Sequence, residues 1–288
     1  MQEREFLAGQ FEEHRPQLRA VAYRMLGSLS EADDAVQEAW LRFSRADSSA
    51  VENLGGWLTT IVSRVCLNML RSRTQRREEP LSFHVPDPIV SSVDDNDPEQ
   101  QALLADSVSL ALLVVLETLT PAERLAFVLH DLFAVPFDDI AAIVDRTPAA
   151  TRQLASRARR RVRHEAPKPD PDLTRQREVV DAFLAAARGG DMEALVALLD
   201  PDVVVRSDGG TRGPTTMLRG VQAVAQGAMA FARIAELARP ALVNGNYGAI
   251  GMVDGKPLSV AAFTVVDGKI VALDILTDPE RIARLDLE

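Results

Sequence analysis

Residues 120–165 read TPAERLAFVLHDLFAVPFDDIAAIVDRTPAATRQLASRARRRVRHE, and this stretch decides the fold of the middle of the chain. The Thr-Pro-Ala-Glu at 120–123 is a capping-box pattern and predicts the start of a helix. A short second helix is expected over Pro136–Val144. The Thr-Pro pair at 147–148 caps a third helix, which runs to about Arg163. A helix, a short turn and a longer basic helix form the layout of a helix-turn-helix.

The third helix has one face expected to pack inward and one basic outward face. Its inward positions recur every four residues: Ala150, Leu154, Ala158 and Val162. The N-terminal turns of such a helix reach base edges, so we expect Thr151, Arg152 and Gln153 to read bases. The later outward and flanking side chains are expected mostly to hold phosphates: Ser156, Arg157, Arg159, Arg160 and Arg163. A solvated basic helix is the alternative, but the helix-turn-helix layout favours DNA binding.

The charge is unevenly distributed. The net charge of −10 argues against a generic DNA-binding protein. Residues 81–145 carry twelve acidic residues and one arginine, whereas residues 146–166 carry seven arginines and one glutamate. This reversal indicates an acidic linker followed by a basic face.

Composition limits the classes of protein. A single cysteine, Cys66, excludes an intramolecular disulfide or a cysteine metal cluster and fits a reducing compartment. We find no leader sequence and no apolar run of about 20 residues, so a soluble cytoplasmic protein without membrane contact is expected. No cofactor or metal is expected.

Two proline-containing segments divide the chain. Residues 78–98 contain four prolines and a cluster of aspartates, and residues 166–172 read APKPDPD. Repeated prolines stop helices, so both segments are expected to be linkers. Three domains remain: 1–77, 99–165 and 173–288.

The first domain has helical periodicity. Within Ala32–Phe43, one side presents a set spaced i, i+3, i+4, i+7: Asp34, Gln37, Glu38 and Leu41. This face could dock a basic partner helix or simply be solvated. A second helix is expected over Gly56–Arg77, with a polar stripe beside its buried face: Thr60, Arg64, Asn68 and Arg71. Arginines near its end, Arg73 among them, could interact favourably with the helix dipole or bind phosphates. The residues alone support these two interpretations about equally.

The third domain changes character. Two helical stretches, Thr174–Arg188 and Met192–Leu199, precede three β-type runs. These runs are Val203–Arg206, Leu258–Val266 and Lys269–Ile275. The Val-Asp-Gly-Lys at 266–269 is a hairpin signal. The domain is therefore expected to be α+β, and the first two all-α.

DDAVQEAWLRF at 33–43, followed by GWLTTIVSRVCLNMLRSRTQRRE at 56–78, resembles the extracytoplasmic function (ECF) sigma factors, as does the helix-turn-helix stretch. The resemblance implies promoter recognition together with core RNA polymerase, whose β′ clamp helices and β flap would be contacted. By this resemblance the Asp34 face would bind the clamp helices, and the polar stripe with Arg73 would face the −10 strand. The loop at 48–56 would hold an extruded base. The linker would thread along the polymerase.

Residues 173–288 resemble the SnoaL-like branch of the NTF2-like fold, in which helices pack into a cone-shaped sheet. Two strings resemble motifs of sigma factors with this appendage. They are Asp208-Gly209-Gly210-Thr211-Arg212 and Asp278-Pro279-Glu280. The resemblance implies a regulatory domain that contacts the sigma domains or the linker.

Two other functions remain as alternatives. One is a helix-turn-helix regulator with a ligand-sensing NTF2-like domain, which leaves the first domain unexplained. The other is an enzyme, in which Asp208, Asp274 and Tyr247 could serve as catalytic residues. All four histidines, the commonest general bases, precede the third domain, which counts against catalysis.

Overall fold

The structure is a computed structural model that describes residues 2–46, 51–76, 84–93, 108–210, 213–231, 237–285 and 287. The described residues form two compact units. The first unit comprises those within 1–80 and 115–165. The second comprises those within 81–114 and 166–288.

The first unit begins with three mutually packed helices, α1 (Gln2–Leu26), α2 (Leu29–Phe43) and α3 (Leu54–Arg76). An aromatic cluster joins them: Phe11, Trp40, Phe43 and Trp57, with neighbouring ring centroids 5.2–6.1 Å apart. Each such pair contributes about 0.5–1.5 kcal/mol beyond its buried area. The cluster therefore fixes the rotation of α2 and α3 about their axes.

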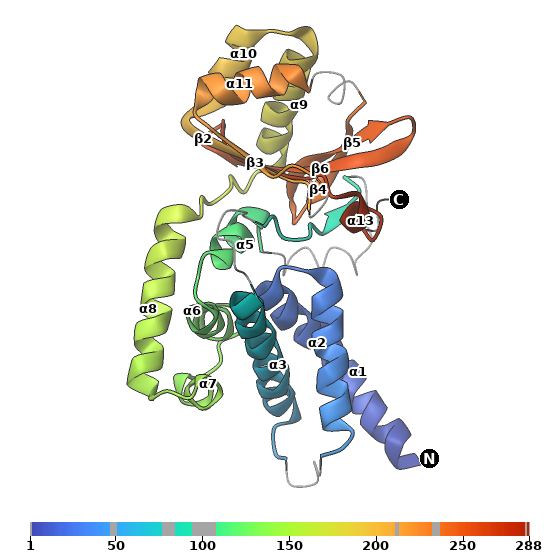
Figure 1. The fold of residues 1–288 in the computed structure, drawn as a ribbon, viewed down its shortest axis with the longest axis vertical. Coiled ribbons are helices and arrows are strands. Elements are labelled where there is room, and N and C mark those ends of the chain that lie inside the picture. The colour runs from blue at the N-terminus through green and yellow to red at the C-terminus, as the bar shows by residue number, and fades with distance from the viewer. Residues whose placement is uncertain are drawn as a thin grey trace. The chain divides into compact units, whose positions relative to one another are not determined.

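The rest of the first unit is helical. The helix α5 (Leu110–Glu117) spans the boundary between the units. It is followed by α6 (Pro121–Phe127), the π-helical turn η1 (Val128–Leu132), α7 (Phe137–Val144) and α8 (Pro148–Glu165) (Figure 1). The expected capping box is confirmed, because Thr120 accepts from the Glu123 N–H and Glu123 from the Thr120 N–H. These helices confirm the expected layout, with the first helix continuing into a π turn.

The second unit contains three further helices, α9 (Leu173–Gly189), α10 (Met192–Leu198) and α11 (Val221–Ala230), and the short α13 (Pro279–Ile282). Its strands are β1 (Val90–Ser91), β2 (Leu199–Asp208), β3 (Thr216–Arg219), β4 (Arg239–Val243), β5 (Asn246–Val253), β6 (Lys256–Val266) and β7 (Lys269–Leu276). Within the described residues they form one sheet in the order β1-β4-β5-β6-β7-β2-β3. All neighbours pair antiparallel except β2 and β7.

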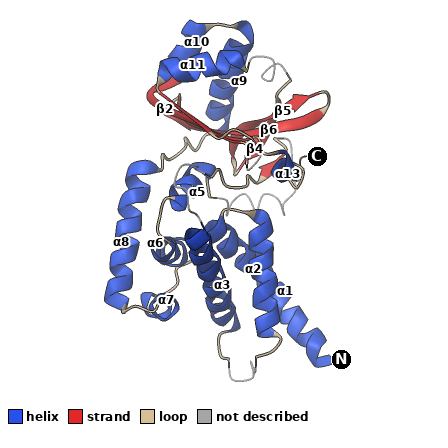
Figure 2. Ribbon diagram, viewed as in Figure 1, coloured by secondary structure: helices blue, strands red, loops and turns tan. Residues whose placement is uncertain are grey.

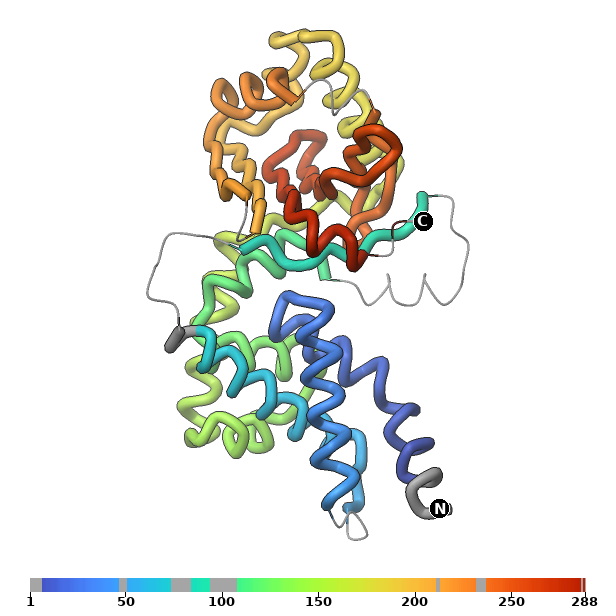
Figure 3. Tube along the Cα trace, turned by 45° about the vertical axis from the view of Figure 1, so that its right-hand side comes forward, coloured from blue at the N-terminus to red at the C-terminus, as the bar shows by residue number. Residues whose placement is uncertain are grey.

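The helices α9, α10 and α11 cover one face of this sheet (Figure 2). The expected α+β class is confirmed, and so is the hairpin at 266–269, where Asp267 and Gly268 have φ of 50° and 74°. Residues 84–93 of the acidic linker lie in the second unit and run beside α13 (Figure 3). Part of it, β1, adds a strand to the sheet edge.

Candidate functional site

The exposed face of α2 is the one expected from the sequence. Asp34, Gln37 and Leu41 are exposed, and 39% of Leu41 is accessible to solvent. Glu38 is half-buried and accepts a hydrogen bond from Arg42 at 2.9 Å. An exposed leucine between acidic and amide groups is suited to an amphipathic basic helix.

The polar stripe of α3 also reaches solvent. Arg64, Asn68 and Arg71 are exposed, whereas Thr60 is half-buried and donates its hydroxyl to the Gly56 carbonyl. Arg64 also donates to the Ala142 carbonyl of α7 at 3.4 Å, so α3 packs against the helix-turn-helix within the first unit. The first part of the preceding loop, residues 48–50, lies outside the described residues.

Arg73 differs from the rest of the stripe. Its side chain is 24% exposed, donates to the Leu26 carbonyl at 3.1 Å and forms an ion pair with Glu31 of α2. A guanidinium held by two partners at a helix junction connects α3 to α1 and α2. Both contacts hold this end of α3 against the other two helices.

The turn before α8 depends on Asp145. This residue closes α7 with φ 56° and ψ 55°, a left-handed conformation that glycine adopts most easily and aspartate tolerates. The chain can thus reverse between α7 and α8 without a glycine.

The inward face of α8 is shifted by one position from the expected one in its first two turns. Thr151, Ala155 and Ala158 are buried, whereas Leu154 and Val162 are only half-buried. Ala158 was expected inward and is buried. Thr151 was expected to read bases, and this prediction is wrong: the residue is 0% exposed and its hydroxyl donates to the Thr147 carbonyl at 3.0 Å. An i−4 hydrogen bond of this kind lets threonine occupy a buried helix position.

The outward face of α8 is strongly basic. Its exposed members are Arg152, Gln153, Ser156, Arg157, Arg160 and Arg163. Arg152 lies over the Phe137 ring, 5.7 Å from its centroid. Arg159 is half-buried and donates to Asp131 of η1 at 2.6 Å, which ties α8 to the preceding helix.

A buried arginine connects the two halves of the first unit. Arg124, 2% exposed, donates to the carbonyls of Leu116 and Met25 and to Glu117 at 2.7–2.8 Å. Met25 belongs to α1, Leu116 and Glu117 belong to α5, and Arg124 belongs to α6. A buried charge is stable only when paired and hydrogen-bonded, so this network requires all of its members.

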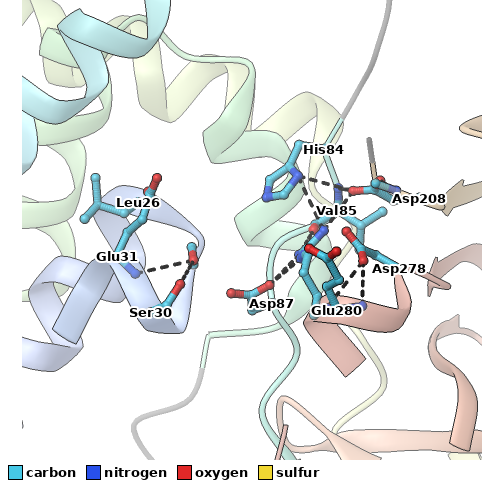
Figure 4. Close-up of polar contacts among 12 residues, drawn as sticks. Leu26, Ser30, Glu31, His84, Val85, Asp87, Asp208, Asp278 and Glu280 are labelled. Carbon is cyan, nitrogen blue, oxygen red and sulfur yellow. Dashed lines mark hydrogen bonds and ion pairs between the residues drawn. The ribbon is translucent and has the colours of Figure 1, made fainter. Parts of the chain in front are cut away.

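In the second unit, the linker lies on the sheet face opposite α9–α11. The Val85 N–H donates to Asp208 at 2.9 Å (Figure 4). Arg281 donates to the Val85 carbonyl and to Asp87, both at 2.6 Å. Arg281 also donates to Asp208 at 3.0 Å. Val85 and Asp87 are buried. We call these interactions, with those of Asn244 below, the linker contact.

Asn244 fixes the next part of the linker. Its side-chain oxygen accepts from the Ile89 N–H at 3.0 Å, and its own N–H donates to the Ile89 carbonyl at 2.8 Å. Its amide nitrogen donates to the Val108 carbonyl at 3.2 Å. Asn244 is 1% exposed, and this one residue satisfies three backbone groups, two with its side chain and one with its own backbone N–H.

The two C-terminal strings expected to be regulatory come together at the linker contact. Asp278 caps α13 by accepting from the N–H groups of Glu280 and Arg281, and Pro279 occupies the first turn. This cap begins the turn that carries Arg281. Gly210 has φ 68°, and an added Cβ would lie 1.9 Å from an Asp278 carboxylate oxygen, so only glycine fits. Gly209 packs similarly against Gly213. Arg212 lies outside the described residues.

The pKa of the Asp208 carboxyl lies well below its usual range. Burial alone would raise it, but hydrogen bonds from His84 and from the N–H groups of Gly210 and Val85, and then the charge of His84, outweigh burial. The Nδ1 of His84 lies 3.2 Å from the Asp208 carboxylate. A histidine distant in sequence thus reaches the third domain.

A cavity of about 380 Å³ lies between the sheet and the helices α9 and α11. The three residues considered for catalysis do not line it. Leu273 and Ile275 line the cavity, so Asp274 between them points to the opposite face, where it pairs with Arg206 at 2.9 Å. Burial raises the pKa of Asp274, and Arg206 only partly offsets this. Tyr247 donates to Asp181 at 3.4 Å.

Among the described residues, no three His, Cys, Asp or Glu side chains gather as a metal site requires. None of the helices seen there has the length and apolar character needed to cross a bilayer.

Comparison with known proteins identifies the two helical domains. Residues 10–76 match the sigma-70 region 2 family, and residues 109–162 match sigma-70 region 4. The ECF RNA polymerase sigma factor SigJ of Mycobacterium tuberculosis is 39% identical, with 94% of this chain and 92% of SigJ covered. The chain belongs to the ECF sigma factor family.

Two further comparisons agree. The probable ECF sigma factor SigI of Mycobacterium tuberculosis is 34% identical, with 96% of this chain and 94% of SigI covered. The crystal structure of Mycobacterium tuberculosis SigJ matches with a TM-score of 0.78 at 37% identity, covering 98% of this chain and 100% of that one. Sigma factors of this family bind core RNA polymerase and promoter DNA. The alternative of a helix-turn-helix regulator is not favoured, because region 2 accounts for the first domain.

Proposed function

We propose that this ECF sigma factor binds core RNA polymerase through the exposed face of α2. The face comprises Asp34, Gln37, Glu38 and Leu41. Leu41 supplies the apolar centre, and the three polar groups surround it and set the charge. The polymerase element that fits this face is the basic clamp helix pair of β′, and the β flap would receive the helix-turn-helix domain.

We further propose that α3 reads the −10 element and α8 the −35 element. On α3 the readers are Thr60, Arg64, Asn68 and Arg71, and Arg73 holds α3 in place. On α8, Arg152 and Gln153 in the first turns would contact base edges. The remaining side chains would bind phosphates: Ser156, Arg157, Arg160 and Arg163, with Arg159 braced by Asp131. The exposure of this basic face supports the assignment.

We propose that the C-terminal domain regulates initiation by holding the linker. The linker joins region 2 to region 4. To engage the polymerase, it must leave its docked path in the second unit and take a different path along the polymerase. Because residues 84–91 are buried or half-buried and bonded to Asp208, Asn244 and Arg281, the domain stabilises an arrangement in which the linker is withheld. The linker contact is the observation that carries this proposal.

Promoter-specific transcription with purified core polymerase tests these proposals. The full chain, Arg281→Met and a 1–166 truncation are compared, with Arg188→Met as a matched control on α9. We expect transcripts at defined promoters, and more of them from Arg281→Met than from the parent. If none of the proteins binds core polymerase or initiates at a promoter, the proposed function is wrong. Equal output from Arg281→Met and the parent would refute regulation through the linker.

The base-reading assignment has its own test. Replacing Arg152 and Gln153 by alanine should relax −35 preference while sparing core binding, and the matched change Arg163→Ala should weaken all promoters alike. Loss of core binding from the first pair would show that the roles are misplaced.

A further inference from the structure

The cavity of the second unit has the composition of a binding site for a small neutral molecule. Its volume, about 380 Å³, falls within the range of about 300–1,000 Å³ common to ligand pockets. The described residues that line it include no charged side chain. Protein interiors ordinarily pack without such space, so a void of this size calls for an occupant.

The mouth of the cavity is also apolar. Phe231 and Leu258 both line it, and they are 61% and 42% exposed. Large apolar side chains exposed together mark interaction sites more often than isolated ones do. An apolar molecule entering here would cover both.

The polar groups of the cavity gather at one end. They are four hydroxyls: Ser207, Thr216, Ser259 and Thr277. Thr216 is the cross-strand partner of Ser207, and Ser259 and Thr277 adjoin Val260 and Leu276, the last pair of the β6–β7 register. Hydroxyls can donate or accept, so they suit a hydroxyl, carbonyl or amine.

We propose that the cavity binds an uncharged, mainly apolar small molecule that carries one hydrogen-bonding group at its inner end. Charged ligands are excluded because burying an isolated charge without a partner is costly. Binding without turnover follows, since none of the described lining residues is an acid, a base or a thiol.

The polar end adjoins the linker contact. Ser207 precedes Asp208, Thr277 precedes Asp278, and the Thr277 N–H and hydroxyl both donate to the Asp208 carbonyl, at 2.8 and 3.1 Å. A ligand bonded to these hydroxyls would therefore alter the position of Asp208. This second step rests on the proposed function of the linker contact.

The test uses the full chain and two fluorescent probes that differ by one sulfonate: neutral N-phenyl-1-naphthylamine and anionic 8-anilinonaphthalene-1-sulfonate. We expect saturable 1:1 binding of the neutral probe and at least about tenfold weaker binding of the anion. Ala261→Phe and Ala228→Phe, which fill the cavity from the sheet and from α11, should each weaken the neutral probe at least about tenfold. Ala230→Phe, on an exposed position of the same helix, is the matched control.

The outcomes separate the two steps. No saturable binding by the parent, or unchanged binding by both filled variants with native circular dichroism, would overturn the binding site. Hydrogen exchange of the Val85 amide with and without the neutral probe tests the coupling. Binding with unchanged exchange would overturn the coupling alone, whatever the transcription assays show.

Discussion

Replacing Arg281 by methionine should release the linker from the second unit. The substitution keeps the aliphatic stem and the helix propensity of α13 but removes the donors to Asp87, Asp208 and the Val85 carbonyl. The side chains of Arg281, Asp87 and Asp208 are 14%, 10% and 4% exposed, so solvent replaces little of what is lost.

The size of the effect follows from this burial. Breaking a buried ion pair by removing one partner costs about 3–5 kcal/mol, because the remaining charges stay uncompensated. At 1.4 kcal/mol per tenfold, the equilibrium for linker docking should fall roughly 100- to 4,000-fold.

Hydrogen exchange followed by mass spectrometry measures this change directly. The amides of Val85 and Ile89 are bonded to Asp208 and Asn244, and their exchange should accelerate by up to that factor. Arg188→Met, on an exposed arginine of α9, should leave these rates unchanged. If exchange at Val85 and Ile89 changes less than about threefold in Arg281→Met while its circular dichroism stays native, the ion pairs do not hold the linker.

Three further predictions follow from buried groups. Because the folded-state pKa of Asp208 is lowered, its stabilising contribution is present above about pH 4 and is lost as the pH falls below that value. The free energy of unfolding in urea should therefore depend less on pH between pH 5 and 3 in Asp208→Asn than in the parent. An equally steep pH dependence in the two proteins would contradict the assignment. Arg124→Met should destabilise the chain by about 3–5 kcal/mol, measured by urea unfolding, with partial recovery of stability when Glu117→Gln is added. If the losses of stability from the two substitutions simply add, the Arg124–Glu117 ion pair does not stabilise the fold. Burial raises the pKa of the Cys66 thiol to about 12, so its alkylation at pH 8 should be roughly a thousandfold slower than that of a free cysteine until urea unfolds the chain.

Much of the helical part could be predicted from sequence because its signals are local. The capping box at Thr120, the proline at the start of α8 and the four-residue spacing of apolar groups act within one or two helical turns. The one-position error on α8 came from treating Thr151 as polar and therefore outward. Its hydroxyl bonds within its own helix, which a periodicity of polar and apolar types does not distinguish.

The central strands could have been found by closer attention to turns. Asn244-Gly245 and Asp254-Gly255 each join two antiparallel strands, and all four residues have positive φ. Such pairs are the strongest short hairpin signals, and they bound β5 on both sides. The glycines and the proline in β4 and β5 masked the strand character.

The resemblance implied that the third domain contacts the sigma domains or the linker, but the residues of the linker contact could not be predicted from sequence. The contact joins residues 123–196 positions apart and depends on a linker whose prolines and acids indicated only an extended segment. The absence of histidine from residues 173–288 likewise gave no sign that His84 would lie beside Asp208. Long-range pairing of this kind depends on the tertiary fold, which no local pattern contains.

The spacing of the linker contact also has a consequence for synthesis. Asp87 and Arg281 are 194 residues apart, and ribosomes add about 5–20 residues per second. For roughly 10–40 s the nascent chain therefore carries a linker whose arginine partner has not yet been made. The complete linker contact can therefore form only in a chain translated past Arg281, after the bonds to Asp208 and Asn244 have become available.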